Sequence, residues 1–219
     1  MCRRNCREFG IINDCASTEY LNIMDKLLLV GAGGFGRVVL EHASLLYDCA
    51  FLDDGDAKVV DGVPVIGSIA DMKKFYPEYK LLLVTIGNND LRENLYNEAA
   101  SMGYTFPNII HPSAYTSPHA SIVKGCIILN NAVVQNNAKI GDGCILNPGV
   151  EAHHDSAIGN YCLVYTNSVI RSLTNVGDRV WIGSTATVST SAQVPADSIV
   201  EDGTVVKAEE YVCAHGKDE

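Results

Sequence analysis

The second half of the chain carries a mostly aliphatic position at every sixth residue, from Ile110 to Val206 without a break. A small residue follows four residues after these positions, from Ala114 to Thr204. A period of six fits neither the 3.6-residue period of an α-helix nor the two-residue alternation of a β-strand. It is the hexapeptide repeat of a parallel β-helix, whose short strands bury their aliphatic positions inside a prism. The sequence therefore predicts a β-helix domain, which we place at residues 108–212.

Apolar segments of alternating type precede the repeat. Short β-branched and leucine-rich runs predict strands, and amphipathic runs between them predict helices. This alternation is typical of a small parallel sheet, so we expect an α/β, Rossmann-like domain over residues 24–107. The expected elements are strands at 26–30, 48–52, 63–66 and 80–86, and helices at 38–46, at 68–76 and up to residue 101.

A glycine-rich turn, GAGGFG at residues 31–36, lies between the first expected strand and helix. In that context G-x-G-x-x-G can hold a phosphate on free N–H groups and a helix N-terminus. The same motif can simply be a tight turn, and both interpretations stay open. About 80 residues are few for a dinucleotide domain, so a nucleotide or nucleotide-sugar is favoured over NAD. The candidate binding residues are Gly31, Gly33, Gly34, Phe35, Gly36, Asp53, Asp54, Gly87 and Asn88.

One polar cluster in the repeat, formed by Asn147, His154 and Asp155, is a candidate for chemistry. His154 falls on an outward position, and a histidine beside a carboxylate suits proton abstraction from an amine or hydroxyl. An ordinary solvent-facing turn histidine fits the local sequence equally well. Zinc needs three or four convergent ligands, and His111 and His119 lie two coils earlier, so no metal site is predicted.

Three hexapeptides, or 18 residues, make one coil of a three-sided prism. On one face, the outward residues that recur every 18 residues are apolar, unlike the equivalent residues on another face. A contiguous apolar stripe on a polar prism marks an interface. A three-sided rod with one such side closes most simply as a ring of three, so we expect a homotrimer held by this stripe. The column consists of Ile127, Ile145, Leu163, Trp181 and Ile199.

Charge and composition narrow the partners. With 16 Lys+Arg against 26 Asp+Glu, the net charge of −10 disfavours nucleic acids and acidic membranes. No apolar run approaches the ~20 residues of a membrane span. Residues 1–23 lack a secretory-signal pattern, so the expected location is the cytoplasm. We interpret residues 1–23 as an upstream extension or disordered tail and residues 213–219 as a C-terminal tail.

The motifs GAGGFGR, DD, IGNNDLR, IHPSA, the hexapeptides and HHDSAIG occur here in an order that resembles the sialic-acid O-acetyltransferase (NeuD) family. That family includes N-acetyltransferases of nucleotide-linked 4-amino sugars, and the resemblance covers residues 24–212. It implies a left-handed β-helix acyltransferase that forms a homotrimer. It also implies that the N-terminal domain holds the nucleotide-sugar and that acetyl-CoA lies between neighbouring prisms.

The same resemblance assigns roles to individual residues. His154 matches the proposed general base, Asp155 the acid that follows it, and Asn147 an upstream asparagine. Three sites depart from the family pattern. Phe35 and Leu163 each stand where relatives commonly carry a histidine, and Thr166-Asn167-Ser168 stands where relatives carry a small Pro/Ser-Gly-Ala segment. The donor-binding residues that the resemblance implies are Leu163, Tyr165, Asn167 and Gly183.

The predicted function is therefore acetyl-CoA-dependent acetylation of an amino or hydroxyl group of a nucleotide-linked sugar, in bacterial surface-glycan biosynthesis. Two other classes stay open. A catalytically degenerate binding or regulatory trimer would keep the glycine loop and explain Leu163. A purely structural trimer would explain the rod but leave the glycine loop without a role. The β-helical carbonic anhydrases share the prism, but their metal histidines are absent from this sequence.

Overall fold

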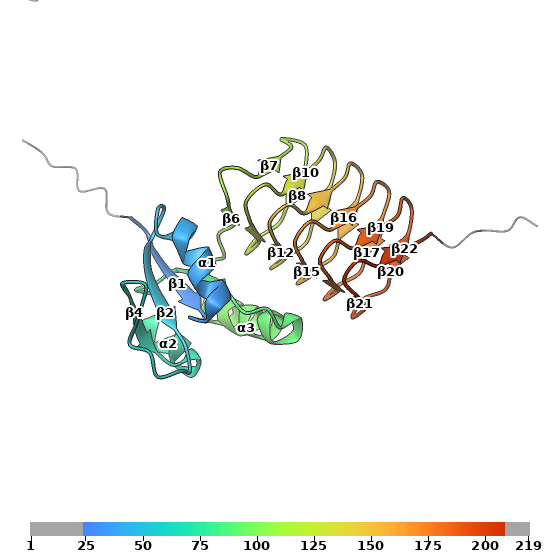
Figure 1. Ribbon diagram of the computed structural model, residues 1–219. Coiled ribbons are helices and arrows are strands. Elements are labelled where there is room, and N and C mark those ends of the chain that lie inside the picture. Colours follow the sequence, from blue (N-terminus) through green and yellow to red (C-terminus); the bar gives the residue numbers. More distant parts are fainter. Residues whose placement is uncertain (1–23, 209–219) are drawn as a thin grey trace, which may run out of the picture.

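The computed structural model describes residues 24–208, which form an α/β unit followed by a β-helix (Figure 1). Predictions for residues 1–23 and 213–219 lie outside this range. In Figure 1 the blue-to-green elements of the α/β unit lie beside the first coils, and the later coils extend away from it.

The α/β unit contains a five-stranded sheet in the order β3-β4-β2-β1-β5. Strand β1 lies between β2 and β5 and is buried along Leu27–Val30, which explains the uninterrupted apolar run there. The elements are β1 (Lys26–Val30), α1 (Gly34–Ala43), β2 (Asp48–Leu52), β3 (Val59–Val60), β4 (Val63–Gly67), a 3-10 turn (Ile69–Asp71), α2 (Met72–Phe75), β5 (Leu81–Val84) and α3 (Asn89–Met102).

Three details of the α/β unit differ from prediction. The sheet is mixed, because the two-residue edge strand β3 runs antiparallel to β4. The first helix begins at Gly34, inside the glycine turn, because this turn already has the geometry of a helix N-terminus. The helix expected at 68–76 is a 3-10 turn capped by Ser68 and Asp71, followed by the short α2.

The β-helix has three faces and confirms the predicted prism. Strands pair in parallel with the strand one coil later, as in Val133 with Glu151 and Val134 with Ala152. The first face consists of β6 (Ile109–Ile110), β9 (Ile127–Ile128), β12 (Ile145–Leu146), β15 (Leu163–Val164), β18 (Trp181–Ile182) and β21 (Ile199–Val200). The second face consists of β7 (Tyr115–Thr116), β10 (Val133–Val134), β13 (Glu151–Ala152), β16 (Val169–Ile170), β19 (Thr187–Val188) and β22 (Val205–Val206). The third face consists of β8 (Ser121–Ile122), β11 (Lys139–Ile140), β14 (Ala157–Ile158), β17 (Asn175–Val176) and β20 (Gln193–Val194).

A four-residue turn follows each strand, and we number the three corners of the prism after the face that they follow. Every sixth residue from Gly125 to Gly203 has a positive φ, so each turn in this stretch contains one left-handed position. Glycine, asparagine and aspartate adopt this conformation at low cost, and they occupy most of these positions. Five positions depart from this rule. Thr185 and Ser191 are small, and the other three residues are bulky: Tyr161 and Arg179 on the third corner and Leu173 on the second.

The apolar stripe on the first face is covered by the chain's own α/β unit. Ile127 and Ile145 are fully buried and Leu163 is 4% exposed, all within the core cluster of the α/β unit. The prediction that this stripe joins neighbouring copies is therefore wrong. The spacing located an interface correctly, but that interface is intramolecular. Ile199, at the far end of the stripe, is left 68% exposed.

Arg92 of α3 is fully buried and links the α/β unit to the β-helix. Its guanidinium donates to carbonyl oxygens of the β-helix at Gly143 (2.9 Å) and Tyr161 (2.6 Å). It also donates to the carbonyl oxygens of Ile86 (3.0 Å) and Gly87 (3.3 Å) in the loop after β5. Burial lowers the pKa of Arg92. The planar fork thus fixes the loop after β5 against two coils at once.

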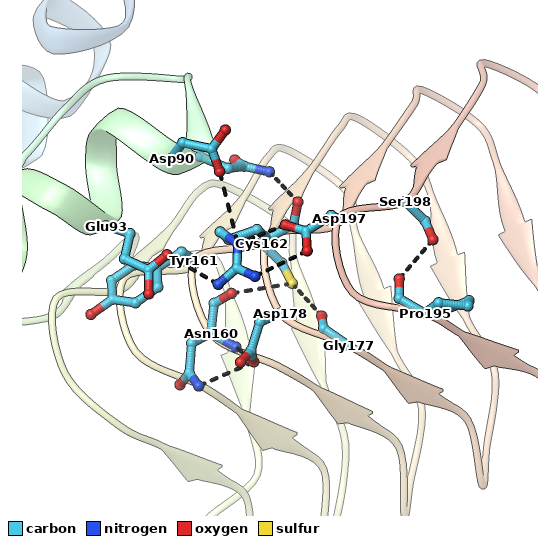
Figure 2. Close-up of polar contacts among 12 residues, drawn as sticks. Asp90, Glu93, Asn160, Tyr161, Cys162, Gly177, Asp178, Pro195, Asp197 and Ser198 are labelled. Carbon is cyan, nitrogen blue, oxygen red and sulfur yellow. Dashed lines mark hydrogen bonds and ion pairs between the residues drawn. The ribbon is translucent and has the colours of Figure 1, made fainter.

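Arg179 makes a second link at the edge of the same junction. Its guanidinium donates to Asp197 at 2.6 and 3.0 Å and to Glu93 of α3 at 3.1 Å. Figure 2 shows Glu93 on α3 and Asp197 on the following coil converging on this point. Hydrogen bonds to Asp197, then to Glu93, raise the pKa of Arg179. The left-handed backbone at this position is therefore combined with contacts to another part of the fold.

Candidate active site

The glycine turn divides into two structural glycines and two open ones. Gly31 has φ +107°, and a Cβ on Gly36 would overlap the carbonyl oxygen of Gly31. Thr85 Oγ1 also donates to that oxygen at 2.6 Å. By contrast, a Cβ on Gly33 or Gly34 would meet nothing within 4 Å. The tight-turn interpretation thus accounts for Gly31 and Gly36, whereas Gly33 and Gly34 keep open space at the start of α1.

The side chains of three other predicted binding residues already accept hydrogen bonds from backbone N–H groups. Asp53 accepts from Ala32 N–H at 2.7 Å and from Gly55 N–H at 2.8 Å. Asp54 accepts from the N–H of Ile69 at 2.9 Å. Asn88 caps α3 by accepting from the N–H of Leu91 at 2.9 Å. These side chains shape the edge of the sheet, and any ligand contact would have to use their remaining lone pairs.

A pocket of about 310 Å³ lies where the glycine turn faces the first face of the β-helix. We call it the junction pocket. It brings residues of the α/β unit together with residues predicted for catalysis and for donor binding. Its walls are mainly apolar, and Val38 and Ile145 were not predicted. The lining residues are Gly34, Phe35, Val38, Gly87, Ile145, Asn147, Leu163 and Tyr165.

A second hollow of about 480 Å³ lies beside the N-terminus of α3 and shares Gly87 with the junction pocket. Its lining includes Arg179, the carboxylates of Asp90, Asp197 and Glu201, and the apolar side chain of Trp181. Gly87 lines both hollows, and its carbonyl oxygen accepts from Arg92 at 3.3 Å. Sequence reasoning missed the roles of Arg92 and Arg179. Arg92 ends the IGNNDLR motif, but its β-helix partners, like the α3 partner of Arg179, lie far away in the sequence.

His154 and Asp155 form a hydrogen-bonded pair on the second corner. His154 Nδ1 lies 2.8 Å from Asp155 Oδ2, and its side chain is 57% exposed. The other carboxylate oxygen accepts from Asn137 Nδ2 at 2.5 Å. These hydrogen bonds, the one from Asn137 first, lower the pKa of Asp155. An ionised Asp155 accepts the proton of Nδ1, which leaves the His154 Nε2 lone pair free.

The contacts of this pair follow the coil spacing. Asn137 stands one coil before Asp155, and Gln135, also on the preceding coil, accepts from the N–H of His154 at 3.0 Å. The 18-residue register could have revealed Asn137 as a partner from the sequence. The neighbouring His153 has a different environment, because its Nε2 lies 3.1 Å from Glu151 Oε2.

One chain does not bring all the predicted site residues together. Asn147 lies on the first corner, where Nδ2 donates to the carbonyl oxygen of Val164 at 3.0 Å. His154 lies on the second corner, beyond β13, and within residues 24–208 it hydrogen-bonds only to Asp155 and Gln135. Asn167 and Gly183 share the first corner with Asn147 but do not line the junction pocket.

In the described part of the chain, no group of three or more His, Cys, Asp or Glu side chains is placed to hold a metal ion. No helix within residues 24–208 is long and apolar enough to cross a membrane.

A glycine turn facing a parallel β-helix, with a histidine–carboxylate pair on an exposed corner, defines a hexapeptide-repeat acyltransferase. Residues 26–99 match the family model of the PglD N-terminal domain. UDP-N-acetylbacillosamine N-acetyltransferase of Bacillus subtilis (strain 168) is 31% identical over 115 residues, 48% of this chain and 52% of that protein. The match therefore spans about half the length of this relative.

Solved structures extend the similarity to both parts of the chain. PerB of Caulobacter crescentus, in complex with CoA and GDP-perosamine, is 31% identical with a TM-score of 0.79, covering 83% of this chain and 88% of that chain. The acetyltransferase domain of PglB from Neisseria gonorrhoeae FA1090, in complex with acetyl coenzyme A, is 31% identical with a TM-score of 0.80, covering 84% and 93%. This chain belongs to the PglD-type family of hexapeptide-repeat sugar acetyltransferases.

Proposed function

We propose that this protein transfers the acetyl group of acetyl-CoA to an amino group of a nucleotide-linked sugar, as a step in glycan biosynthesis. The observation that carries the proposal is the His154–Asp155 pair, whose geometry leaves Nε2 as a base. Relatives named as N-acetyltransferases of UDP- and GDP-linked sugars support nitrogen rather than oxygen as the acceptor atom.

The chemistry follows from that pair. The sugar amine attacks the thioester carbonyl carbon, the new C–N bond forms, and His154 Nε2 takes the proton that the nitrogen loses. The thioester C–S bond then breaks and coenzyme A leaves. Asp155 keeps the imidazole in the required tautomer and stabilises its protonated form. General-base catalysis of this kind contributes about 10²–10⁴-fold, and the alignment of the two substrates supplies the rest.

The junction pocket is the proposed acceptor site. Free N–H groups at Gly33 and Gly34 suit a phosphate of the nucleotide, because the N-terminus of α1 adds its positive dipole end there. Phe35 and Leu163 form an apolar wall for the sugar ring, and Asn147 supplies a polar group beside it. We assign the donor to the first corner, along Asn147, Tyr165 and Gly183, which repeat at the coil spacing.

A homotrimer is part of this proposal. The junction pocket and His154 lie on different sides of one prism, so a base from one copy would have to act on an acceptor held by its neighbour. A ring of three prisms brings the second corner of each copy towards the first corner of the next. The half-exposed His154, with a free Nε2, supports this arrangement. The cytoplasmic location expected from the sequence remains a prediction.

A mass-spectrometric assay tests the proposal. The purified protein is incubated with acetyl-CoA and a panel of UDP- and GDP-linked amino sugars, with sialic acids as hydroxyl acceptors. The expected product is a nucleotide-sugar heavier by one acetyl group, stable to mild alkali as an amide is. Binding of a nucleotide-sugar without turnover would favour the degenerate binding protein, for which the apolar Phe35 and Leu163 are the supporting observation. An alkali-labile product would move the acceptor to oxygen.

A further inference from the structure

Leu173 occupies the strained position of the turn that lies one coil beyond Asp155. Its φ is +61°, a left-handed conformation that branched side chains adopt only at a cost. Its side chain is also 58% exposed, so packing within the described chain does little to compensate for that cost. Strain that persists without a structural reason points to a functional one.

The other two bulky left-handed residues show what compensates such strain elsewhere. Tyr161 packs on Tyr96 of α3 with ring centroids 6.0 Å apart, and Arg179 binds Glu93 and Asp197. Both side chains lie against the α/β unit. At these two positions of the third corner a bulky residue in the left-handed region is thus a contact residue, which indicates that Leu173 also has a partner.

The backbone of Leu173 is exceptional as well. At every left-handed corner position from Gly143 to Gly203 except Leu173, the N–H donates to a carbonyl oxygen of the preceding coil, as Asp155 does to Asn136 (3.2 Å). For Leu173 the equivalent acceptor is the carbonyl oxygen of His154, and that bond is not formed. Among the described residues 24–208 this N–H group therefore has no acceptor, and it lies one coil beyond the proposed base.

A free N–H next to an exposed aliphatic side chain selects a ligand with a carbonyl on an apolar chain. The arm of acetyl-CoA has this composition, because its thioester and amide carbonyls are separated by methylene groups. The arm must also pass close to His154, since the thioester and the attacking amine meet there. Two residues stand one coil away from Asp155 and could contact the arm. Asn137, on the preceding coil, already donates its side-chain amide to Asp155, which leaves Leu173 on the following coil.

We propose that Leu173 is a donor-binding residue, whose side chain packs on the apolar arm of acetyl-CoA and whose N–H donates to a carbonyl oxygen of that arm. The inference rests on the proposed acetyl transfer and adds a direction to it, because the donor then extends from His154 towards the C-terminal coils. It also implies that the chain retains a strained residue, at some cost to stability, for donor affinity.

Leu173→Asn separates these two effects, because asparagine relieves the strain and keeps the N–H but removes the apolar contact. The variant should melt about 2–4 °C higher than the wild type. In calorimetric titrations with coenzyme A, its Kd should rise roughly tenfold, the loss expected for one partly buried aliphatic side chain. The KM for the sugar should stay unchanged.

Ser191→Asn is the matched control, because Ser191 has the same backbone conformation one coil further along and its N–H is bonded to Ser172. It should leave the Kd for coenzyme A unchanged. Hydrogen exchange at the Leu173 amide should slow when coenzyme A binds to the wild-type protein, and unchanged exchange would overturn the proposed hydrogen bond.

Two results distinguish failure of this inference from failure of the function. If the wild type binds coenzyme A and transfers acetyl groups, but Leu173→Asn binds it equally well, the inference is wrong and the function stands. If the wild type does not bind coenzyme A at all, both are wrong. A change of molecular mass by light scattering for Leu173→Asn would assign Leu173 to a contact between copies and overturn the donor assignment.

Discussion

The third and second corners of the prism have the same backbone but opposite surroundings. On the third corner, Tyr161 and Arg179 contact α3 and stabilise the junction between the two parts of the chain. On the second corner, His154, Asp155 and Leu173 are all exposed, and no part of the α/β unit covers them. One repeat thus builds both a structural edge and a reactive one. Substitutions on the covered side should reduce stability, and those on the open corner should reduce catalysis.

The largest expected effect is on the open corner. His154→Ala should lower kcat by about 10²–10⁴, because Nε2 no longer takes the proton, while the melting temperature stays near that of the wild type. Steady-state kinetics and thermal melts on the same sample measure both. His153→Ala is the control and should retain most activity, since His153 is paired with Glu151 instead. Equal losses from both variants would contradict the distinction between the two histidines.

The next effect falls on the covered side. Arg92→Met should lower the free energy of unfolding by about 3–5 kcal/mol, because several buried carbonyl oxygens lose their donor at once. Urea unfolding measures this loss. Arg37→Met is the matched control, since the guanidinium of Arg37 is exposed and, within residues 24–208, bonds only to Asp61, and it should change stability little. Similar stabilities for the two variants would show that the buried fork does not hold the junction.

Alanine substitutions of two isoleucines on the first face test the difference between its covered end and its open end. Ile145→Ala should cost about 2–4 kcal/mol of unfolding free energy, because the fully buried side chain leaves a cavity beneath the α/β unit. Ile199→Ala should change it by less than about 0.5 kcal/mol, because that side chain is 68% exposed. Equal losses would mean that Ile199 is also covered, as in an assembly.

The smallest effect is the pH dependence of the Asp155 contacts. Hydrogen bonds to its carboxylate lower its pKa in the folded protein, so they stabilise the fold while the carboxylate is ionised. This contribution is present above the unfolded pKa of about 4 and is lost as the pH falls through the lowered folded value. The melting temperature of Asp155→Asn should therefore lie slightly below that of the wild type at neutral pH, and the difference should vanish in acid. A difference that persists in acid would assign the effect to something other than ionisation.

Much of this molecule could be predicted because its strongest signals are local. The six-residue period placed the β-helix strands, since each strand repeats the same small choice of inward and outward residues. The glycine turn predicted the start of α1 approximately, and the coil spacing predicted that His154 points outward. The antiparallel β3 was missed, because a two-residue edge strand has no period of its own. The clamps at Arg92 and Arg179 were missed too, because their partners lie far away in the sequence.

By itself, the sequence determined the prism, the glycine turn and the identity of the histidine–carboxylate pair, because each depends on residues close together in the chain or at a fixed period. Only the tertiary structure decided what covers each side of the prism. It placed the α/β unit over the stripe of Ile127, Ile145 and Leu163, and it left the corner of His154 open. Apolar surface can be buried by any partner of suitable shape, so a stripe in the sequence indicates an interface without specifying whether another copy or the same chain covers it.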